Sequence, residues 1–343
     1  MAFVIEFFAG IAATLMWIPL GIAALFVQAT APLTHANVQG MEQPGVVFSV
    51  KQAESFGEDP MKMYDAILAD LHPRYIRLIA YWDRIEKSQG TFDFSELDQY
   101  VKKAEHDHVL LTLIVGRKVP RWPECHIPQW AQGLDQQDQE KALDAYLTAF
   151  VNHYKGSPAV ELWQVENEPF LNFGPCQYPP EVASINKEVA LVHALDHSRS
   201  VMVTASGELE TWLRPFMAGD VVGASLYRRF FVTTPWFRLG LNYPLPPLFY
   251  ELKAKLYQLF YPHKQFMITE LQLEPWLPIS IVQAPLDMQF KELPFSSFKG
   301  YIAYAHQTGV ARVYLWGVEW WYWLAQHGHS EYWNYVRDSV FTH

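Results

Sequence analysis

Positive charge is scarce in this chain of 343 residues. Lysine and arginine together number 26, against 36 aspartates and glutamates, which gives a formal net charge of −10. A protein that binds nucleic acid mainly through phosphates needs a basic stripe to neutralise them, and the sequence has none. The charge balance therefore argues against nucleic acid as the main partner and favours a neutral ligand.

Several cofactor and catalytic motifs are also missing. The sequence has no Gly-x-Gly-x-x-Gly turn after its first expected strand, no Gly-x-Ser-x-Gly elbow and no phosphate-binding loop. Histidines pair at His106 and His108 and again at His327 and His329, but no third ligand follows at a spacing typical of a metal site. We therefore expect no metal and no organic cofactor.

Cysteine is limited to Cys125 and Cys176. Each follows a different expected strand by about ten residues, so both would lie on neighbouring loops at one end of the domain. A disulfide between them and two separate thiols are both compatible with the sequence.

The N-terminal region has no lysine or arginine before Lys51. Residues 7–27 carry no charge and are long enough to cross a bilayer as a helix. The missing positive n-region favours a retained anchor, whereas the small residues of Val27-Gln28-Ala29 also permit a cleaved signal peptide, and a buried soluble helix is a third option. The catalytic part is accordingly expected outside the cytoplasm, either membrane-anchored or secreted.

From about residue 45 onward, short β-rich runs alternate with amphipathic helical stretches. Eight such runs occur: 46–50, 75–79, 109–115, from about 160, 201–205, 221–226, 265–270 and 311–316. This alternation predicts the α/β class and a single (β/α)8 TIM barrel, with an open doubly wound sheet as the structural alternative. The expected organisation is an anchor or signal segment (1–30), a polar linker (31–44) and a barrel domain (45–343).

Aromatic residues are abundant, at 15% with 13 tryptophans. This abundance suits stacking on the apolar faces of sugar rings, although a bulky core would also use such residues. The segment 230–261 crowds aromatics around four prolines. It could be a lid over the site, a surface resting on the membrane, or a barrel-covering helix with a long lead-in, and we favour the helix.

Two of the expected strands end on glutamate. One runs into Glu166-Asn167-Glu168, and the other finishes on Glu270. Because reactive groups of a (β/α)8 barrel lie at the carboxyl ends of its strands, Glu168 and Glu270 should meet across the barrel mouth. Glycoside hydrolysis needs such a pair: one acid protonates the leaving oxygen, and one carboxylate attacks the anomeric carbon or activates water. Glu166 competes with Glu168 for the acid role.

Further side chains are expected at the same mouth. Arg77 ends the second strand, where it could hold Glu270 ionised through a charge-assisted hydrogen bond. Trp316 ends the eighth strand, with core packing as its alternative role. Glu274 and Glu319 would lie on the rim and bind sugar hydroxyls.

With these motifs the sequence resembles glycoside hydrolase clan A, the retaining (β/α)8 glycosidases. The clan places an Asn-Glu pair after strand four and a lone glutamate after strand seven, as Asn167-Glu168 and Glu270 do here. The resemblance implies Glu168 as acid/base and Glu270 as nucleophile. It further implies that Asn167 grips the sugar 2-hydroxyl, that Tyr227 hydrogen-bonds the nucleophile, and that Trp316 lies beneath the cleaved sugar.

Within the clan, residues 81–94 look closest to families 39 and 42, where a tryptophan and a Gly-x-Phe-Asp segment follow strand two. Family 5 typically carries histidines where this chain has Gly116-Arg117 and Ser225-Leu226. The expected substrate-binding residues are Arg77, Asn167, Tyr227, Trp316, Trp82 and Glu319.

The expected function is a retaining β-glycoside hydrolase acting on oligo- or polysaccharide, of cellulase or β-galactosidase type. The alternative is a carbohydrate-binding or transglycosylating barrel of the cell envelope. Besides its carbohydrate partner, the chain is expected to contact the membrane through its N-terminal segment.

Overall fold

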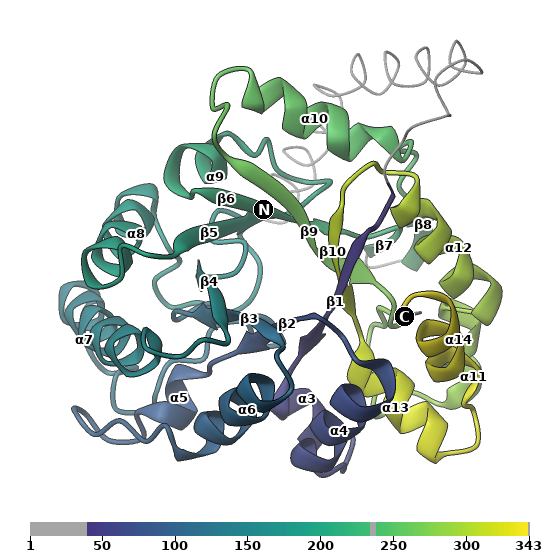
Figure 1. The fold of residues 1–343 in the computed structure, drawn as a ribbon, viewed down its shortest axis with the longest axis horizontal. Coiled ribbons are helices and arrows are strands. Elements are labelled where there is room, and N and C mark those ends of the chain that lie inside the picture. Colours follow the sequence, from purple (N-terminus) through teal and green to yellow (C-terminus); the bar gives the residue numbers. More distant parts are fainter. Residues whose placement is uncertain (1–39, 234–237, 342–343) are drawn as a thin grey trace.

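Eight parallel strands close into a barrel in the order β1-β10-β9-β6-β5-β4-β3-β2. The computed structural model describes residues 40–233 and 238–341. The barrel strands are β1 (Gln43–Phe48), β2 (Tyr75–Ile79), β3 (Leu110–Val115), β4 (Val160–Val165), β5 (Ser200–Ala205), β6 (Val221–Leu226), β9 (Gln265–Gln272) and β10 (Arg312–Trp316). Figure 1 shows these strands at the centre of the molecule. The predicted (β/α)8 barrel is confirmed, and the open-sheet alternative is wrong.

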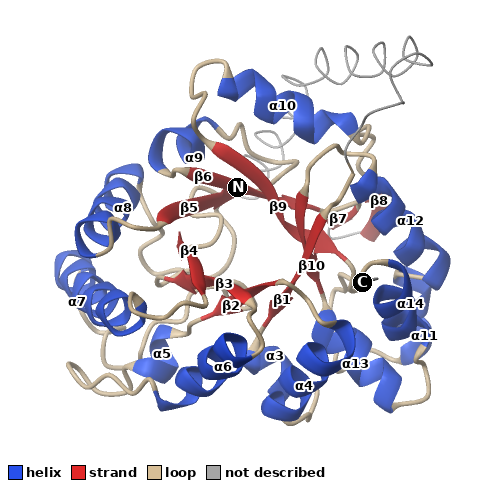
Figure 2. Ribbon diagram, in the orientation of Figure 1, coloured by secondary structure: helices blue, strands red, loops and turns tan. Residues whose placement is uncertain are grey.

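Helices surround the barrel on the outside, as Figure 2 shows in blue around red strands. They are α3 (Val50–Ser55), α4 (Pro60–Ala66), η2 (Ile67–Leu71), α5 (Trp82–Ile85), α6 (Ser95–His106), α7 (Gln136–Tyr154), α8 (Val182–Leu195), α9 (Leu213–Ala218), α10 (Leu248–Gln258), α11 (Leu286–Glu292), α12 (Phe295–His306), α13 (Val318–Gln326) and α14 (Glu331–Ser339). Several of these helices begin at residues whose side chains cap the first turn. At α4, for example, the Asp59 side chain accepts hydrogen bonds from the backbone N–H groups of Met61 and Lys62, and Pro60 takes the first helical position.

The barrel interior has its own apolar cluster, separate from the one between strands and helices. Its members include Val47, Ile79, Ile114, Met202, Met267, Tyr314 and Trp316, together with Val119 from the loop after β3. Side chains alternate along each strand, so every second residue points into the barrel. Because a loop residue completes this cluster, the loop after β3 must enter the barrel mouth.

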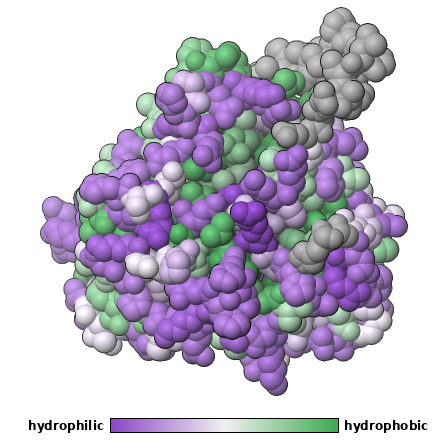
Figure 3. Space-filling model, viewed as in Figure 1, coloured by the Kyte–Doolittle hydropathy of each residue, from purple (hydrophilic) through white to green (hydrophobic). Residues whose placement is uncertain are grey.

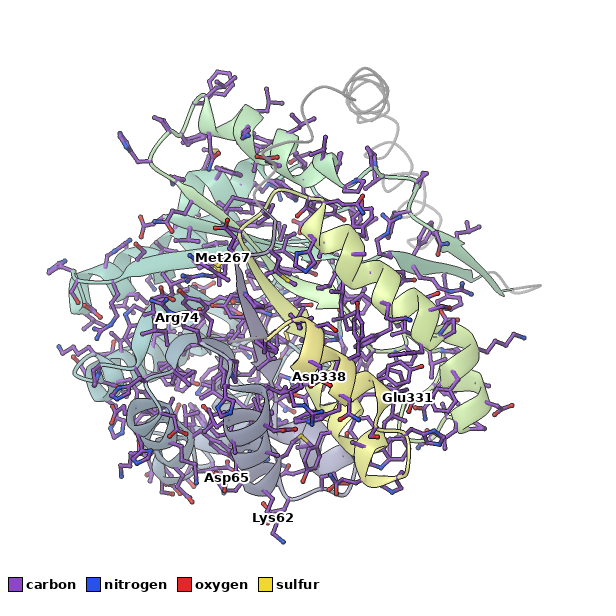
Figure 4. All side chains as sticks on the ribbon, turned by 45° about the vertical axis from the view of Figure 1, so that its right-hand side comes forward. Lys62, Asp65, Arg74, Met267, Glu331 and Asp338 are labelled. Carbon is purple, nitrogen blue, oxygen red and sulfur yellow. A yellow bond between two sulfur atoms is a disulfide. The ribbon has the colours of Figure 1, made fainter. Side chains whose placement is uncertain are left out.

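The outer faces of the helices carry most of the charge. Figure 4 shows Lys62 and Asp65 projecting from α4, and Glu331 and Asp338 on α14, whereas Met267 belongs to a central strand. The face of the molecule in Figure 3 is accordingly mostly hydrophilic, with smaller hydrophobic areas between.

The aromatic and proline-rich segment forms a two-stranded hairpin and a helix. β7 (Arg229–Thr233) pairs antiparallel with β8 (Arg238–Asn242), and α10 follows at the edge of the barrel (Figure 1). The helix buries Phe249, Tyr250 and Ala254. A barrel-covering helix was predicted here, but the β-hairpin in its lead-in was not.

The expected anchor or signal segment, residues 1–30, lies outside the described residues. Within the described part of the chain, no helix is long and apolar enough to cross a membrane.

A disulfide joins Cys125 to Cys176, with a Cα–Cα distance of 5.4 Å. The sequence left this pairing open. The bond ties the loop after β3 to the loop after β4, two loops that flank the barrel mouth.

Replacing both cysteines by serine should lower the free energy of unfolding by about 2–4 kcal/mol, because the bond restricts an unfolded segment spanning 51 positions. Urea titration of the oxidised wild type and the double variant measures the change. A transition midpoint that does not move would contradict the expectation, and a Cys176→Ser single variant should behave like the double variant.

Candidate active site

Arg77 connects the strands that carry the candidate catalytic residues. Its guanidinium rises from β2 and is fully buried. Nη1 donates to Glu270 Oε1 at 2.8 Å, Nη2 to Asn167 Oδ1 at 2.7 Å and Nε to Gln164 Oε1 at 2.7 Å. The expected hydrogen bond between Arg77 and Glu270 is therefore confirmed. Since its side chain is inaccessible, however, Arg77 is not itself a substrate-binding residue, and its contacts position the two motifs instead.

Glu270, at the end region of β9, has a donor on each carboxylate oxygen. Arg77 reaches Oε1, and the Tyr227 hydroxyl donates to Oε2 at 3.3 Å. Tyr227 is itself held through its backbone N–H, which donates to Glu208 at 2.9 Å. The two donors fix the direction of the Glu270 carboxylate. A nucleophile needs such a fixed direction because it must approach the reacting carbon along one line.

Glu168 follows β4 on a bent backbone. Its φ of 42° lies in the left-handed region, which L-residues adopt at a cost that surrounding contacts must offset. Here the backbone N–H donates to Thr204 Oγ1 at 2.8 Å, and the carbonyl accepts from Lys118 Nζ at 2.7 Å. These contacts turn the Glu168 side chain to the barrel mouth.

The Glu168 carboxyl is poised in its protonated form. Burial raises its pKa well above the usual value, and the negative charges of Glu270 and then Glu210 raise it further, while a hydrogen bond with Ser225 works in the opposite direction. Arg77 hydrogen-bonds both Glu270 and Asn167, the residue directly before Glu168, so the two glutamates belong to the same part of the barrel mouth. A protonated carboxyl beside an ionised one can supply a proton and a nucleophile together.

Glu166 has a structural role. It is fully buried, and its two oxygens accept from the backbone N–H groups of Arg117 at 3.0 Å and Lys118 at 2.5 Å. Gly116 lies directly against it, since a Cβ there would approach the carboxyl carbon to 2.6 Å. Glu166 therefore holds the loop after β3, which leaves Glu168 as the candidate acid. The same contact explains a glycine where family 5 typically has a histidine.

Trp82 does not lie at the site, so its expected sugar-binding role is wrong. The side chain is fully buried, stacks on Tyr146 with ring centroids 5.6 Å apart, and donates its indole N–H to Glu86 at 2.6 Å. The short helix α5 turns Trp82 into the layer between barrel and helices, where it serves as core.

Glu319 is also not a rim residue. It is fully buried at the start of α13, where Oε1 accepts from the Ser49 backbone N–H at 2.6 Å and Oε2 from Arg121 Nη2 at 2.7 Å. Its expected role in binding sugar hydroxyls is wrong, because both oxygens already have protein donors. Glu274 pairs with the same Arg121 and accepts from the Trp316 indole at 2.9 Å.

Trp316 lies at the mouth end of β10 and is mostly buried. One face of its ring is covered by the Arg121 guanidinium, 3.8 Å from the ring centroid. Arg121 leaves the other face of the Trp316 ring uncovered by its own guanidinium. That Trp316 lies beneath the cleaved sugar remains a prediction.

Sequence reasoning did not identify several charged residues of the site. Glu124, from the loop after β3, interacts with Asn167, and burial followed by the charge of Glu270 raises its pKa to about 8. Glu210 accepts from the Ser206 backbone N–H at 2.6 Å, and burial raises its pKa to about 7. Lys118 and Arg121 complete the set. The only available signal was the concentration of charge in a loop otherwise rich in proline and tryptophan.

Replacing Glu210 by glutamine should move the alkaline limb of the pH–rate profile to lower pH, by about 0.5–1 unit. The sign follows from charge: a negative neighbour disfavours ionisation of Glu168, so removing it lowers the Glu168 pKa. The profile of kcat/KM against pH measures the shift. A Glu208→Gln variant is the comparison, since Glu208 contacts Tyr227 and Tyr250 instead, and an equal shift in both variants would contradict the assignment.

A surface hollow of about 940 Å³ lies elsewhere. It is lined by residues such as His72, Arg74 and His108, which precede β2 and β3, and so it opens at the amino ends of the strands. Barrel chemistry occurs at the opposite ends, and we therefore place the site with Glu168 and Glu270. In the described ranges, no group of three or more His, Cys, Asp or Glu residues could hold a metal ion.

The comparisons with known proteins agree with this geometry. Residues 79–179, less than a third of the chain, match the model of glycosyl hydrolase family 10. No curated protein shows significant sequence similarity to the chain. The family-model match confirms the resemblance to clan A.

Solved structures share the barrel fold. A xylanase 10C variant from Cellvibrio japonicus, in complex with xylopentaose, is 15% identical with a TM-score of 0.56, over 82% of this chain and 59% of that one. Xylanase 10B from Thermotoga petrophila, in complex with xylobiose, is 14% identical with a TM-score of 0.52, over 82% and 83%. A β-galactosidase from Halorubrum lacusprofundi is 15% identical with a TM-score of 0.52, over 80% of this chain and 52% of that one. The chain thus spans about half the length of this β-galactosidase and of another from Marinomonas.

Proposed function

We propose that this chain is a retaining β-glycosidase that cleaves oligo- or polysaccharide by double displacement. The observation that carries the proposal is the pairing of two unlike carboxyl groups. Glu270 accepts hydrogen bonds from a buried arginine and from Tyr227, whereas burial and the charge of Glu270 raise the Glu168 pKa. Two acids in such different surroundings can act as nucleophile and proton donor.

The proposed reaction has two steps. In the first, Glu168 gives its proton to the glycosidic oxygen while Glu270 attacks the anomeric carbon, so that the C–O bond breaks and a glycosyl ester forms. In the second, the now ionised Glu168 takes a proton from water, which attacks the same carbon and releases Glu270. To Asn167, held by Arg77 at 2.7 Å, we assign the hydrogen bond with the sugar 2-hydroxyl that the clan resemblance implies.

The substrate class we propose is a β-linked glycan, with β-1,4-xylo-oligosaccharides to be tested first. Support comes from the family 10 match and from fold relatives that were solved with xylobiose and xylopentaose. The match covers only residues 79–179, so β-galactosides and β-glucosides belong in the same panel.

A panel of aryl β-glycosides tests the proposal, with the anomeric form of the first product followed by NMR. Hydrolysis with a β-configured first product is the expected result. Hydrolysis that is unchanged in both Glu168→Ala and Glu270→Ala would refute the proposal, and an α-configured first product would refute double displacement.

We further propose that the enzyme acts outside the cytoplasm, anchored or released through residues 1–30. The disulfide between Cys125 and Cys176 supports this location, because such bonds persist in oxidising compartments. Protease accessibility of the full chain in intact cells, with and without residues 1–30, tests the idea.

A further inference from the structure

A buried polar network covers one side of the barrel mouth. At the ends of β1 and β2, Ser49 Oγ lies 2.6 Å from the Tyr81 hydroxyl, and the Ser49 backbone N–H donates to Glu319. Glu319 in turn accepts from Arg121, which also pairs with Glu274. None of these side chains is more than slightly exposed. The strand ends that could face a sugar on this side are therefore occupied by contacts within the protein.

Arg121 belongs to a loop that crosses the barrel mouth. It follows β3, whereas Glu274 follows β9, and these two strands lie on opposite sides of the closed barrel, four places apart in either direction. Their ion pair must therefore span the opening. Val119 of the same loop packs into the barrel interior together with Tyr81 and Trp316. Arg121 and Glu124 have φ values of 85° and 72°, so the loop holds an unfavourable backbone to maintain this path.

Beside this ion pair, toward the ends of β4 and β6, the mouth differs in character. Trp122 and Trp276 belong to the same two loops as Arg121 and Glu274, but their rings contact Phe173, which follows β4, and Tyr227, which follows β6. Three large aromatic side chains there are accessible: Trp276 is 39% exposed, Phe173 41% and Trp122 69%. Their rings form a continuous series that starts at Tyr227, with successive centroid distances of 5.5, 6.3 and 6.0 Å. Accessible aromatic faces next to a reacting centre suit stacking on sugar rings or another flat group.

The proposed chemistry indicates which part of the substrate would lie on each side of the barrel mouth. Glu168 protonates the leaving oxygen, so the leaving group lies toward the loop after β4, which also carries Phe173. With the sugar attacked by Glu270 placed over Trp316, as the clan resemblance implies, a further sugar on its non-reducing side would extend away from the leaving group. That direction leads toward β10, which lies opposite β4 in the closed barrel, and toward β1 and β2 beside it. That is the side covered by the Arg121 network.

We propose that the enzyme accepts a single sugar on the non-reducing side of the cleaved bond and therefore removes residues from chain ends, while the aromatic series holds the leaving part of the substrate. This inference rests on the proposed function and deepens it. An additional sugar on the non-reducing side would have to displace a buried Arg–Glu network, whose disruption leaves charges without partners.

Matched aryl glycosides test the inference directly. The substrates are the nitrophenyl β-monoside and β-bioside of the sugar that the wild-type enzyme cleaves best, and the readout is direct release of nitrophenol. We expect kcat/KM for the monoside to be at least tenfold higher. An equal or higher value for the bioside overturns the inference but leaves the proposed function intact, whereas hydrolysis of no glycoside in the panel refutes both.

Removing the Arg121 side chain should weaken the enzyme's preference for the monoside over the bioside. Arg121→Ala should raise the bioside-to-monoside ratio by at least tenfold, while Arg84→Ala should leave it unchanged. Arg84 is a matched control because it also pairs with two glutamates, Glu54 at 2.6 Å and Glu96 at 2.8 Å, but does so on the outer helices. If Arg121→Ala does not fold, combining it with Glu274→Gln and Glu319→Gln removes the unpaired charges. A folded variant with an unchanged ratio overturns the inference.

Discussion

Glu270→Ala should lower kcat on an activated aryl β-glycoside by about four orders of magnitude or more, which corresponds to roughly 5 kcal/mol of transition-state stabilisation. The loss is large because no covalent intermediate can form without the carboxylate that Arg77 and Tyr227 orient. Steady-state rates with a dinitrophenyl glycoside measure it. Added azide should restore turnover in this variant and yield a glycosyl azide of inverted configuration.

The matched control for that variant is Glu161→Gln. Glu161 is also a strand glutamate paired with an arginine, Arg312 at 2.6 Å, but it lies near the amino end of β4. Its activity should stay within about twofold of wild type, as for most surface substitutions. If Glu270→Ala keeps more than a tenth of the wild-type rate, Glu270 is not the nucleophile.

Glu168→Ala should lower kcat/KM by about 10²–10⁴-fold for substrates with poor leaving groups, and far less for dinitrophenyl glycosides. The difference arises because a good leaving group departs without a proton, whereas a sugar alcohol needs one. Comparing the two substrate types on the same variant gives an internal control. An equal loss on both types would contradict the role of Glu168 as the acid.

The pH profile gives an independent measure of the same residue. In the wild type, Glu168 must be protonated for the first step, so activity is present below its raised pKa and is lost as the pH rises through it. In Glu168→Ala, the alkaline limb should disappear for activated substrates. A limb that persists unchanged would assign the titration to another group, such as Glu124, whose pKa is about 8.

Strand positions and strand-end chemistry could be predicted because both depend on local sequence. Residues 75–79 and 221–226 form strands with the predicted bounds, since short and mostly apolar runs such as YIRLI and VVGASL are typical of strands buried on both faces. The carboxyl ends of parallel strands share one rim, so Glu168 and Glu270 were expected to meet there.

Other features depend on tertiary structure that no local pattern encodes. Trp82 and Glu319 follow strands just as Tyr227 does, yet short helices turn both into the interior. The path of the loop after β3 depends on positive φ values at Arg121 and Glu124, residue types that give no signal for this conformation. The β7–β8 hairpin was not predicted either, because β7 reads RFFVT, without alternation, and only β8 alternates leucine with other residues.

The loop after β3 separates two properties that enzymes often encode together. Bond cleavage is assigned to groups fixed on or beside strands, such as Arg77 and Glu270, whereas the accepted chain length is assigned to residues 119–122, a part of this loop that excludes Lys118 and Glu124. Natural variation or directed evolution confined to that one segment should therefore convert an end-trimming catalyst into a mid-chain cutter without altering its chemistry.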